Sequence, residues 1–475
     1  MSQRPAVAGS AIADPGSFRP DHDGLRASDP LAFPGYSEML AAASRRASAD
    51  ESVVAGPATI AGHEVELALF DFSFLGGSMG EVAGERLARA LERAADRAVA
   101  FVLRTTTGGA RMQEGMHALV QMAKVTVARA RLRQAHVPFL CILGNPTTGG
   151  VLASLASQAD VIAAEAGATI GFAGPRLVQN FTGRPLQEGS HTAARAYRHG
   201  LVDAQVPPDG ARSFVVDVLD VLRPDEPETI HFDEVIHDDL DPWDAVAAAR
   251  AADRPTPAAL LEDVTDSMVV VRGDREGTDD PALLCGIARV AGRRAVVIAM
   301  DRAHAPGPAA YRKARRCIRL AESLALPVVT LIDTRGADPS EGPEAGGIAW
   351  EIAATFDAML TADAPSLAIV TGQGGSGGAL ALAVADRLSI YRDAVFSVIA
   401  PESAAEILWR DSGRAGEAAR ALQPTASSLR DAGIADDVVA APLDAISLRA
   451  AVASGIDTLR GVTHKARQER WRRHA

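Results

Sequence analysis

The chain has 475 residues, of which 47% are hydrophobic and 23% charged, and it carries a formal net charge of −12. This length suits two to three domains and this composition supports ordinary globular cores, so a wholly disordered chain is excluded. The acidic balance argues against nucleic-acid binding by general electrostatic attraction. The three cysteines stand far apart, which excludes a disulfide scaffold and a four-cysteine zinc site and favours a reducing cytoplasm.

Neither a targeting segment nor a membrane span is expected. Residues 1–18 lack the uninterrupted apolar stretch of a signal peptide. The most apolar long stretch, residues 366–388, is interrupted by five glycines and is not typical of a membrane-spanning helix. The histidines show no H-x-x-x-H or H-E-x-x-H spacing, so no metal site is predicted. These features favour a cytoplasmic protein without a membrane or nucleic-acid partner.

The first half begins with a segment of unusual composition. Residues 1–50 are rich in Pro, Asp, Ser and Ala and are expected to form an N-terminal lead-in, wrapped on the surface or partly disordered. A first α/β domain is expected over residues 51–225, because short β-branched runs alternate with helical patterns. One such pattern, residues 81–97, predicts a helix. The predicted strands lie at residues 64–72, 98–103, 138–143 and 161–164.

The second half of the chain shows the same alternation of strand and helix patterns, after a segment of different composition. Residues 226–260 are acidic and contain several prolines, which predicts a linker. A second α/β domain is expected over residues 261–450. Residues 451–475 form a basic C-terminal tail, for which a solvated helix is expected.

The two halves share one arrangement of glycines. In each half a buried strand leads into one glycine-containing turn, and the next buried strand leads into a second. Gly109 precedes Gly149 by 40 residues, and Gly336 precedes Gly377 by 41. This matched spacing predicts two homologous α/β domains in tandem.

Glycines at such junctions have several uses, which the residues alone leave open. They can be purely steric, where a helix packs closely. Residues 372–377 match the dinucleotide-binding pattern G-x-G-x-x-G, but the corresponding first-half segment does not. Residues 374–378 match the G-x-S-x-G of a hydrolase, but the only later histidines are His464 and His474. The remaining use is an oxyanion hole, in which backbone N–H groups hold a developing negative oxygen. Two junctions per half would make one hole per half, which suits two carbonyl substrates.

The motifs at these junctions resemble those of a known family. The stretches that resemble the β subunit of bacterial acetyl-CoA carboxylase carboxyltransferase are DFSFLGGSMG (71–80), GGARMQEG (108–115), PTTGG (146–150) and GFAGPR (171–176). Those that resemble its α subunit are YRKA (311–314), IDT (332–334), GGSGGA (374–379) and PE (401–402). The resemblance covers about residues 29–443 and implies a fused β–α carboxyltransferase. It also implies the fold: two homologous α/β domains in tandem, each of the ClpP/crotonase ββα superhelix type.

The resemblance implies an activity. A carboxyl group would pass from carboxybiotin on a carrier protein to the α-carbon of an acyl-CoA, with acetyl-CoA giving malonyl-CoA as the expected reaction. The α-proton would pass to the biotin ureido nitrogen, so no side-chain base is needed. The expected donors to the thioester enolate oxygen are Gly109, Ala110 and Gly150. Those expected for the biotin ureido oxygen are Gly336, Ala337, Gly378 and Ala379.

Further residues are expected to bind the substrates: Gly108, Arg111, Gly149, Phe172, Ala173, Gly174, Arg176, Arg335 and Gly377. Arg111, Lys124 and Arg176 could meet CoA phosphates, although an arginine beside a glycine loop is also a common structural clamp. The chain holds no biotinylated Met-Lys-Met and no ATP-binding domain, so separate biotin carboxylase and biotin carrier proteins are expected as partners. The resemblance further implies a homodimer in which the first half of one copy faces the second half of another.

The chain departs from the family pattern in four respects. It has no four-cysteine zinc ribbon, so no zinc is expected. Arg335 stands where the family has proline, and Asn145 where it has aspartate. The basic segment before Tyr311 is shortened to residues 301–308. Two alternatives therefore stay open: a biotin-independent decarboxylase or hydrolase of malonyl thioesters on the same fold, and a non-catalytic scaffold subunit.

Overall fold

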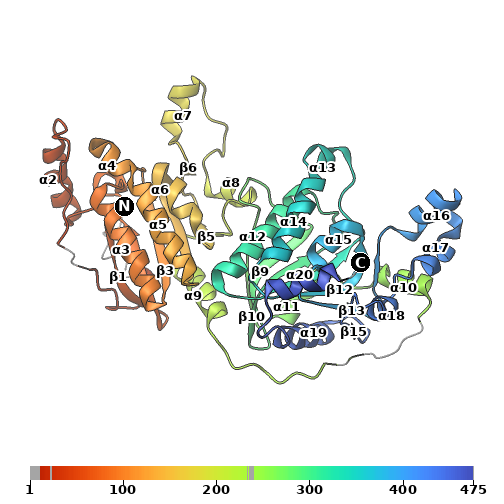
Figure 1. The fold of residues 1–475 in the computed structure, drawn as a ribbon. Helices are drawn as coiled ribbons and strands as arrows, with labels where there is room; N and C mark the ends of the chain where they lie inside the picture. Colours follow the sequence, from red (N-terminus) through yellow and green to blue (C-terminus); the bar gives the residue numbers. More distant parts are fainter. Residues whose placement is uncertain (1–10, 22–23, 233, 235–239, 474–475) are drawn as a thin grey trace. The chain divides into compact units, whose positions relative to one another are not determined.

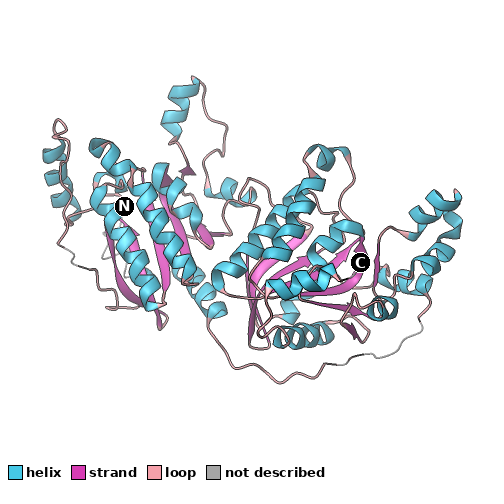
Figure 2. Ribbon diagram, in the orientation of Figure 1, coloured by secondary structure: helices cyan, strands magenta, loops and turns pink. Residues whose placement is uncertain are grey.

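The computed structural model describes residues 11–21, 24–232, 234 and 240–473. They form two compact units, Met1–Asp220 and Val221–Ala475, each built on its own mixed β-sheet (Figure 1). Figure 2 shows that helices cover the strands in both units. Each unit therefore has the layered α/β architecture expected from the alternating sequence pattern.

The first unit contains a seven-stranded sheet in the order β1-β2-β3-β4-β5-β7, with β6 paired to β4. Its strands are β1 (Val53–Ile60), β2 (His63–Phe70), β3 (Ala100–Thr107), β4 (Phe139–Thr148), β5 (Val161–Glu165), β6 (Ile170–Gly171) and β7 (Ala204–Val206). Its helices are α2 (Tyr36–Ala47), α3 (Glu81–Arg97), α4 (Met116–Leu119), α5 (Gln121–Gln134), α6 (Gly149–Ser154), α7 (Pro175–Thr182), α8 (Ala193–Arg198) and α9 (Ala211–Leu222), the last of which crosses the boundary between the units.

The second unit contains an eight-stranded sheet in the order β15-β13-β12-β11-β10-β9-β8, with β14 paired to β12. Its strands are β8 (Ser267–Val270), β9 (Leu283–Val290), β10 (Arg293–Met300), β11 (Val328–Thr334), β12 (Ser366–Gly375), β13 (Arg387–Tyr391), β14 (Val395–Ser397) and β15 (Asp437–Val439). Its helices are α10 (Pro242–Ala249), α11 (Pro257–Val264), α12 (Pro308–Leu324), α13 (Glu341–Ala345), α14 (Ile348–Thr361), α15 (Ser376–Ala383), α16 (Pro401–Trp409), α17 (Ala415–Leu422), α18 (Ala426–Asp431), α19 (Ala445–Asp457) and α20 (His464–Arg472).

The two sheets share one order of strands, except that β8 at the edge of the second sheet has no counterpart in the first. An antiparallel hairpin opens each repeat, β1–β2 in the first and β9–β10 in the second, and the following strands run parallel. Each hairpin turns on an Ala-Gly pair, Ala61-Gly62 and Ala291-Gly292, with positive φ at both residues. Two residues with positive φ are the conformation that a tight hairpin turn requires. The internal repeat expected from the glycine spacing is therefore present in the backbone.

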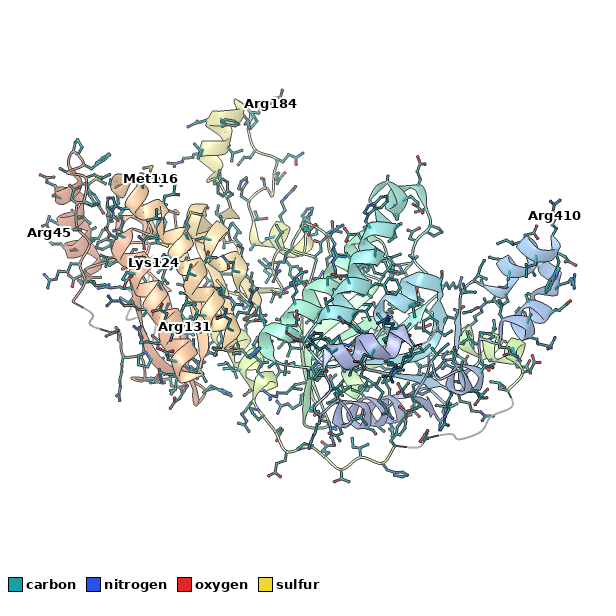
Figure 3. All side chains as sticks on the ribbon, in the orientation of Figure 1. Arg45, Met116, Lys124, Arg131, Arg184 and Arg410 are labelled. Atoms are coloured by element: carbon teal, nitrogen blue, oxygen red, sulfur yellow. The ribbon has the colours of Figure 1, made fainter. Side chains whose placement is uncertain are left out.

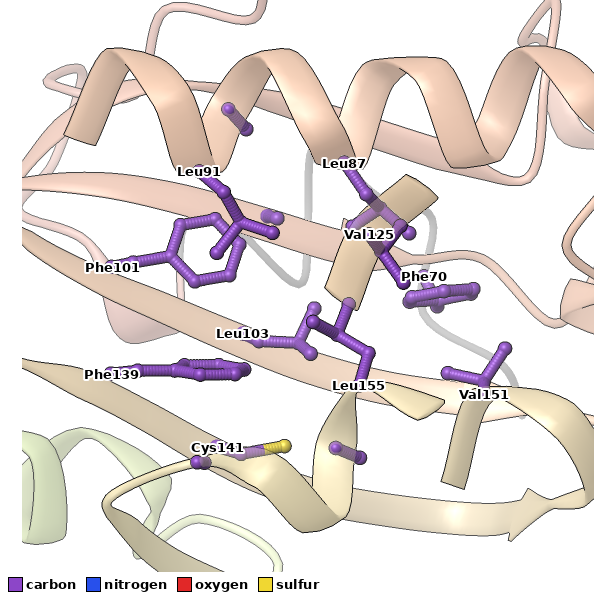
Figure 4. Packing of buried hydrophobic residues seen from close by; sticks show 14 of the residues in the cluster. Phe70, Leu87, Leu91, Phe101, Leu103, Val125, Phe139, Cys141, Val151 and Leu155 are labelled. Atoms are coloured by element: carbon purple, nitrogen blue, oxygen red, sulfur yellow. The ribbon is translucent and has the colours of Figure 1, made fainter. Parts of the chain in front are cut away.

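The core of the first unit lies between its sheet and the helices α3 and α5. Figure 4 shows Leu87 and Leu91 of α3 above Phe101 and Leu103 of β3. The rings of Phe101 and Phe139 lie 5.1 Å apart between centroids, a separation typical of favourable aromatic pairs. The apolar residues of α3 recur with helical spacing and so form one face of the helix. Burial of this face holds α3 on the sheet and positions β3, the strand that follows it.

The prediction that residues 226–260 are only a linker is wrong. Helix α10 lies within them and packs its alanines against Val395 and Ala419 of the second unit. The Arg250 guanidinium donates to Gln373 and to Glu402, and that of Arg254 donates to Asp393 and to the Thr371 carbonyl. The described part of this segment is thus integral to the second unit, and long-range contacts of this kind leave no trace in local composition.

The two terminal segments are also held on their units. Asp14 accepts hydrogen bonds from Thr59 and Arg212, which ties the described part of the lead-in to the first unit. In the basic tail, Arg467 is 1% exposed and donates to Asp386, while Arg470 donates to Asp436. The prediction of a solvated tail helix is therefore wrong, because the arginines of α20 neutralise acidic groups around β13.

Candidate active site at paired glycine junctions

The carboxyl ends of β3 and β4 bring two glycine turns of the first unit into contact. A Cβ built on Gly149 would lie only 2.8 Å from Gly109 Cα. Gly109 and Gly149 also have φ of 111° and 70°, a region that side chains disfavour. The register of β3 against β4 shifts between Thr105 and Thr107, which carries the strand ends out of regular pairing and into these turns. Both glycines are therefore required by the close approach of the two backbones.

The first junction leaves two backbone donors free. The Ala110 and Gly150 N–H groups have no acceptor in the described part of the chain. A Cβ on Gly150 would lie 3.7 Å from the Ala110 nitrogen, so the two donors lie beside the same small space. Paired donors at one point are the geometry that stabilises a developing oxyanion.

Gly109 does not supply a donor, which corrects the sequence prediction. Its N–H donates to Thr107 Oγ1 at 3.0 Å, and the Gly149 N–H donates to the Phe172 carbonyl at 2.9 Å. The N–H of Gly108, which is exposed, donates to the Gly76 carbonyl at 2.9 Å. These three glycines shape the junction, whereas Ala110 and Gly150 keep their N–H groups available.

The second unit has the same junction between β11 and β12. A Cβ on Gly375 would collide with the Arg335 carbonyl oxygen, and one on Gly378 would lie 2.9 Å from the Ala337 nitrogen. The Gly336 N–H donates to Thr334 Oγ1 at 3.1 Å, as Gly109 does to Thr107, so Gly336 is likewise not a free donor. The free donors are Ala337 and Gly378, for which the described residues provide no acceptor.

Two further predicted residues lie in the helix that follows this junction. Ala379 is buried one residue beyond Gly378 in α15. Gly377 has open space where a Cβ would lie. The surroundings of Gly377 would therefore accommodate a side chain, whereas those of Gly378 would not.

Arg111 is a structural clamp, and the prediction that its guanidinium meets CoA phosphates is wrong. The side chain is fully buried and donates to Glu51 and Glu114. Tyr36 donates to the same Glu114 at 2.6 Å. A guanidinium held by two buried carboxylates is neutralised within the unit and cannot approach a phosphate.

The turn from β6 into α7 carries the remaining predicted first-unit residues. The carbonyl of Phe172 accepts from Gly149, so this turn, with Ala173 and Gly174, lies directly against the first junction. The Phe172 side chain is 73% exposed and that of Arg176 is also exposed, so both are free to contact a ligand. Lys124 belongs to α5 and is labelled in Figure 3, and its ammonium group pairs with Glu85 of the neighbouring α3 at 3.2 Å.

The two substituted residues among the four departures from the family pattern, Asn145 and Arg335, have different surroundings. Asn145 Oδ1 accepts from the Thr169 N–H at 3.0 Å, a bond that an aspartate oxygen could equally make. Arg335 is exposed beside the second junction. Its charge contributes, after that of Arg250, to holding the pKa of Glu402 below its usual value. Arg335 therefore places a positive charge near the second junction without blocking it.

Asp333, at the end of β11, serves the fold. It is buried, accepts from the Gln373 N–H at 3.0 Å and pairs with Arg302 at 2.9 Å. Burial raises the pKa of this carboxyl above its usual value, while the bonds from Gln373 and Arg302 oppose the rise. The carboxylate is thus bonded within the second unit, where it fixes the start of the second glycine turn.

The roles of Thr107 and Thr334 were not predicted from the sequence. Each occupies the last position of its strand and accepts the N–H of the glycine two residues later. The sequence did contain a sign of this role, since the two threonines occupy matching positions in the two repeats. Among the described residues no three His, Cys, Asp or Glu side chains group as metal ligands, and no helix there is long and apolar enough to cross a membrane.

The fold and the junctions define a class of protein: two crotonase-like domains in tandem, each with a pair of backbone donors at its strand ends. A transcarboxylase 12S structure superposes with a TM-score of 0.78 at 23% identity, covering 96% of this chain and 90% of that one. A single-chain, multi-domain long-chain acyl-CoA carboxylase superposes with a TM-score of 0.72 at 20% identity, covering 94% of this chain and 45% of that one. These likenesses confirm the predicted fold.

Sequence comparison narrows the class to a family. The model of acetyl co-enzyme A carboxylase carboxyltransferase-like domains matches residues 215–465. The acetyl-coenzyme A carboxylase carboxyl transferase subunits beta/alpha of Salinispora tropica are 43% identical over 91% of this chain and 81% of that protein. A probable biotin-dependent acyl-coenzyme A carboxylase beta3 subunit of Mycobacterium bovis is 38% identical over 87% of this chain and 85% of that protein. The chain belongs to the acetyl-CoA carboxylase carboxyltransferase family and is the carboxyltransferase component of such an enzyme, as its motifs predicted.

Proposed function

We propose that the protein transfers a carboxyl group from biotin on a carrier protein to the α-carbon of an acyl-CoA, with acetyl-CoA as the acceptor and malonyl-CoA as the product. The observation that carries this proposal is the presence of two free backbone N–H groups at matched junctions in both units, Ala110 with Gly150 and Ala337 with Gly378. Two separate holes suit a reaction that develops negative charge on two different carbonyl oxygens.

The first junction would hold the thioester. The Ala110 and Gly150 N–H groups would donate to its carbonyl oxygen and stabilise the negative charge that develops when the α-proton leaves. Each such donor contributes roughly 2.7–4 kcal/mol in enzymes where one has been removed. The exposed side chains of Phe172 and Arg176, beside this junction, would contact the CoA moiety, with Arg176 donating to a phosphate.

The second junction fits a ureido oxygen. A Cβ on Gly378 would lie 2.9 Å from the Ala337 nitrogen, so only a glycine lets the two donor-bearing turns approach each other this closely. Bound biotin would supply the carboxyl group from its ureido nitrogen and accept the α-proton there. The glycine-containing turns themselves, Gly108-Gly109-Ala110 and Gly336-Ala337, carry no carboxylate or imidazole. The protein's task is then to hold the two oxygens and to align the groups that react.

The proposal includes partners. A biotin carboxyl carrier protein would deliver the carboxyl group, and a biotin carboxylase would load it. The likeness to a transcarboxylase whose structure is described as a hexamer assembly supports a homo-oligomer, for which we propose a dimer as the unit that completes the site. Both units keep glycines where a side chain would collide with the facing turn. A scaffold subunit would not need these close approaches, so they count against that alternative.

The reaction run backwards tests the proposal. Purified protein is incubated with malonyl-CoA, with and without biocytin, and release of acetyl-CoA is followed. The proposal expects release that depends on biocytin. Release at the same rate without biocytin would show a decarboxylase of malonyl thioesters. No release from malonyl-CoA or from methylmalonyl-CoA would favour a scaffold subunit.

A further inference from the structure

The hydroxyl of Tyr311 is a buried polar group without a partner. Tyr311 is 1% exposed, its ring packs among Ile348 and Ala381, and its Oη has no hydrogen-bond partner among the described residues. Leaving a buried hydroxyl unpaired costs stability, so such a group requires an explanation. The position of Oη suggests an explanation, because the hydroxyl lies at the second glycine junction.

Oη shares its surroundings with the free donors of that junction. A Cβ on Gly378 would lie 2.6 Å from Tyr311 Oη, 2.9 Å from the Ala337 nitrogen and 3.2 Å from Ala337 Cβ. The hydroxyl and the Ala337 nitrogen therefore both lie against residue 378, and this close approach is possible only because that residue is glycine.

The first unit has no hydroxyl at the matching position, although the Oε1 of Gln121, which lies there, is also buried without a partner among the described residues. Helices α3 and α12 both contain 17 residues and both follow a glycine, so their positions correspond one to one. The position of Tyr311 corresponds to Gly84, where the side chain of Gln121 fills the space. Near Gly150 the neighbouring side-chain atom is instead the Met122 sulphur, at 3.1 Å from a built Cβ. Packing of this fold therefore does not require a tyrosine there.

The hydroxyl is suited to donate. Burial raises the pKa of Tyr311 above its usual range, and the negative charge of Asp280 adds to the rise. The group therefore stays protonated over the physiological range and offers its hydrogen to an acceptor.

We infer that Tyr311 is a third hydrogen-bond donor of the second hole and that it binds the ureido oxygen of biotin together with the Ala337 and Gly378 N–H groups. This inference rests on the proposed function and adds a side chain to a hole otherwise made of backbone. It also distinguishes the two holes, since the first offers two donors and a sulphur whereas the second offers three donors. A ureido oxygen is a strong acceptor, and an additional donor stabilises the negative charge that develops on it.

Tyr311→Phe tests the inference, with Tyr391→Phe as its matched control. Tyr391 is also buried in the second unit, but its hydroxyl already lies 3.0 Å from Ser447 Oγ. Removal of an unpartnered hydroxyl should leave the melting temperature of Tyr311→Phe unchanged or raised, whereas Tyr391→Phe should melt at a lower temperature. Binding of biocytin, measured by calorimetry, should weaken about tenfold in Tyr311→Phe and stay unchanged in Tyr391→Phe, since a hydrogen bond of about 1.4 kcal/mol corresponds to tenfold.

Kinetics of the reverse reaction complete the test. In Tyr311→Phe the value of kcat/KM for biocytin should fall about a hundredfold, while KM for malonyl-CoA stays unchanged. Wild-type binding and turnover in Tyr311→Phe, or a loss that affects both substrates together with a lowered melting temperature, would overturn the inference. Wild-type protein that neither binds nor requires biocytin would overturn the proposed function and the inference with it.

Discussion

Gly109 and Gly149 are held so close that neither can carry a side chain. A Cβ on Gly149 would lie 2.8 Å from Gly109 Cα, and one on Gly109 would lie 3.0 Å from Gly149 Cα. This contact joins the ends of β3 and β4 and sets the positions of the Ala110 and Gly150 N–H groups. A single backbone contact therefore determines whether the first hole has its donors in place.

Gly149→Ala should abolish biocytin-dependent release of acetyl-CoA. The added Cβ must push the two turns apart, in addition to the strain of a side chain at positive φ. Gly167→Ala is the matched control, because Gly167 also has positive φ but has open space around its Cβ position. The control should lose only about 1–2 kcal/mol of stability and keep its activity. Equal activity in the two variants would show that the contact is not needed.

Arg111→Ala should destabilise the first unit by about 3–5 kcal/mol, because it leaves Glu51 and Glu114 buried without their cation. Thermal unfolding followed by calorimetry measures this loss. Any effect on KM for malonyl-CoA should appear only near the lowered melting temperature. A stable Arg111→Ala protein with raised KM would instead favour direct contact with CoA.

Arg176→Ala should leave stability unchanged, since the side chain is exposed on α7. Its KM for malonyl-CoA should rise, because a charge-assisted bond to phosphate is lost. The comparison uses malonyl-pantetheine, which lacks the nucleotide phosphates and should be turned over equally by wild type and variant. A rise in KM for both thioesters would place Arg176 elsewhere in the binding site.

Asp14 should make the lead-in segment sensitive to acid. The Arg212 guanidinium, with further bonds from Thr59 and two backbone N–H groups, holds the pKa of Asp14 below its ordinary value of 3.8. A depressed folded-state pKa contributes stability that is present above pH 3.8 and is lost as the pH falls below that value. The melting temperature of Asp14→Asn should therefore lie below that of wild type at pH 7, and the difference should shrink at acid pH.

Asp50→Asn is the control for Asp14. Asp50 is half exposed and lies 3.7 Å from Arg26, so this pair should contribute little at any pH. A difference between Asp14→Asn and wild type that stays constant with pH would contradict an ionic origin for the tether.

Local pattern predicted much of this fold. The helix expected over residues 81–97 is α3 with the same bounds, because its apolar face recurs with helical spacing. Strand β1 was missed, since it contains Pro57 and its hairpin turn begins with Ala61, a residue that rarely takes positive φ. The arginines of α20 were expected to be solvated, because their acidic partners Asp386 and Asp436 are distant in sequence.

The candidate site was only partly predictable, because its hydrogen-bond partners are also distant in sequence. Spacing alone could identify the glycine junctions, since the repeat displays them twice. It could not show that Thr107 and Thr334 occupy two of the expected donors, or that Glu51 neutralises Arg111 from 60 residues away. Donor availability depends on hydrogen bonds made across strand ends, which only the folded chain reveals.

If the two units hold different substrate oxygens, Gly150→Ala and Gly378→Ala should affect different substrates. A Cβ on Gly150 meets the flexible Met122 side chain, and one on Gly378 lies beside Ala337 and Tyr311. Gly342→Ala, with open space around its Cβ position, serves as control.

The measurement is KM for malonyl-CoA and for biocytin in the reverse reaction of each variant. We expect Gly150→Ala to raise KM for malonyl-CoA alone and Gly378→Ala to raise KM for biocytin alone. Gly342→Ala should change neither KM. The reverse pattern would exchange the two assignments. Equal effects of both variants on both substrates would contradict two separate holes.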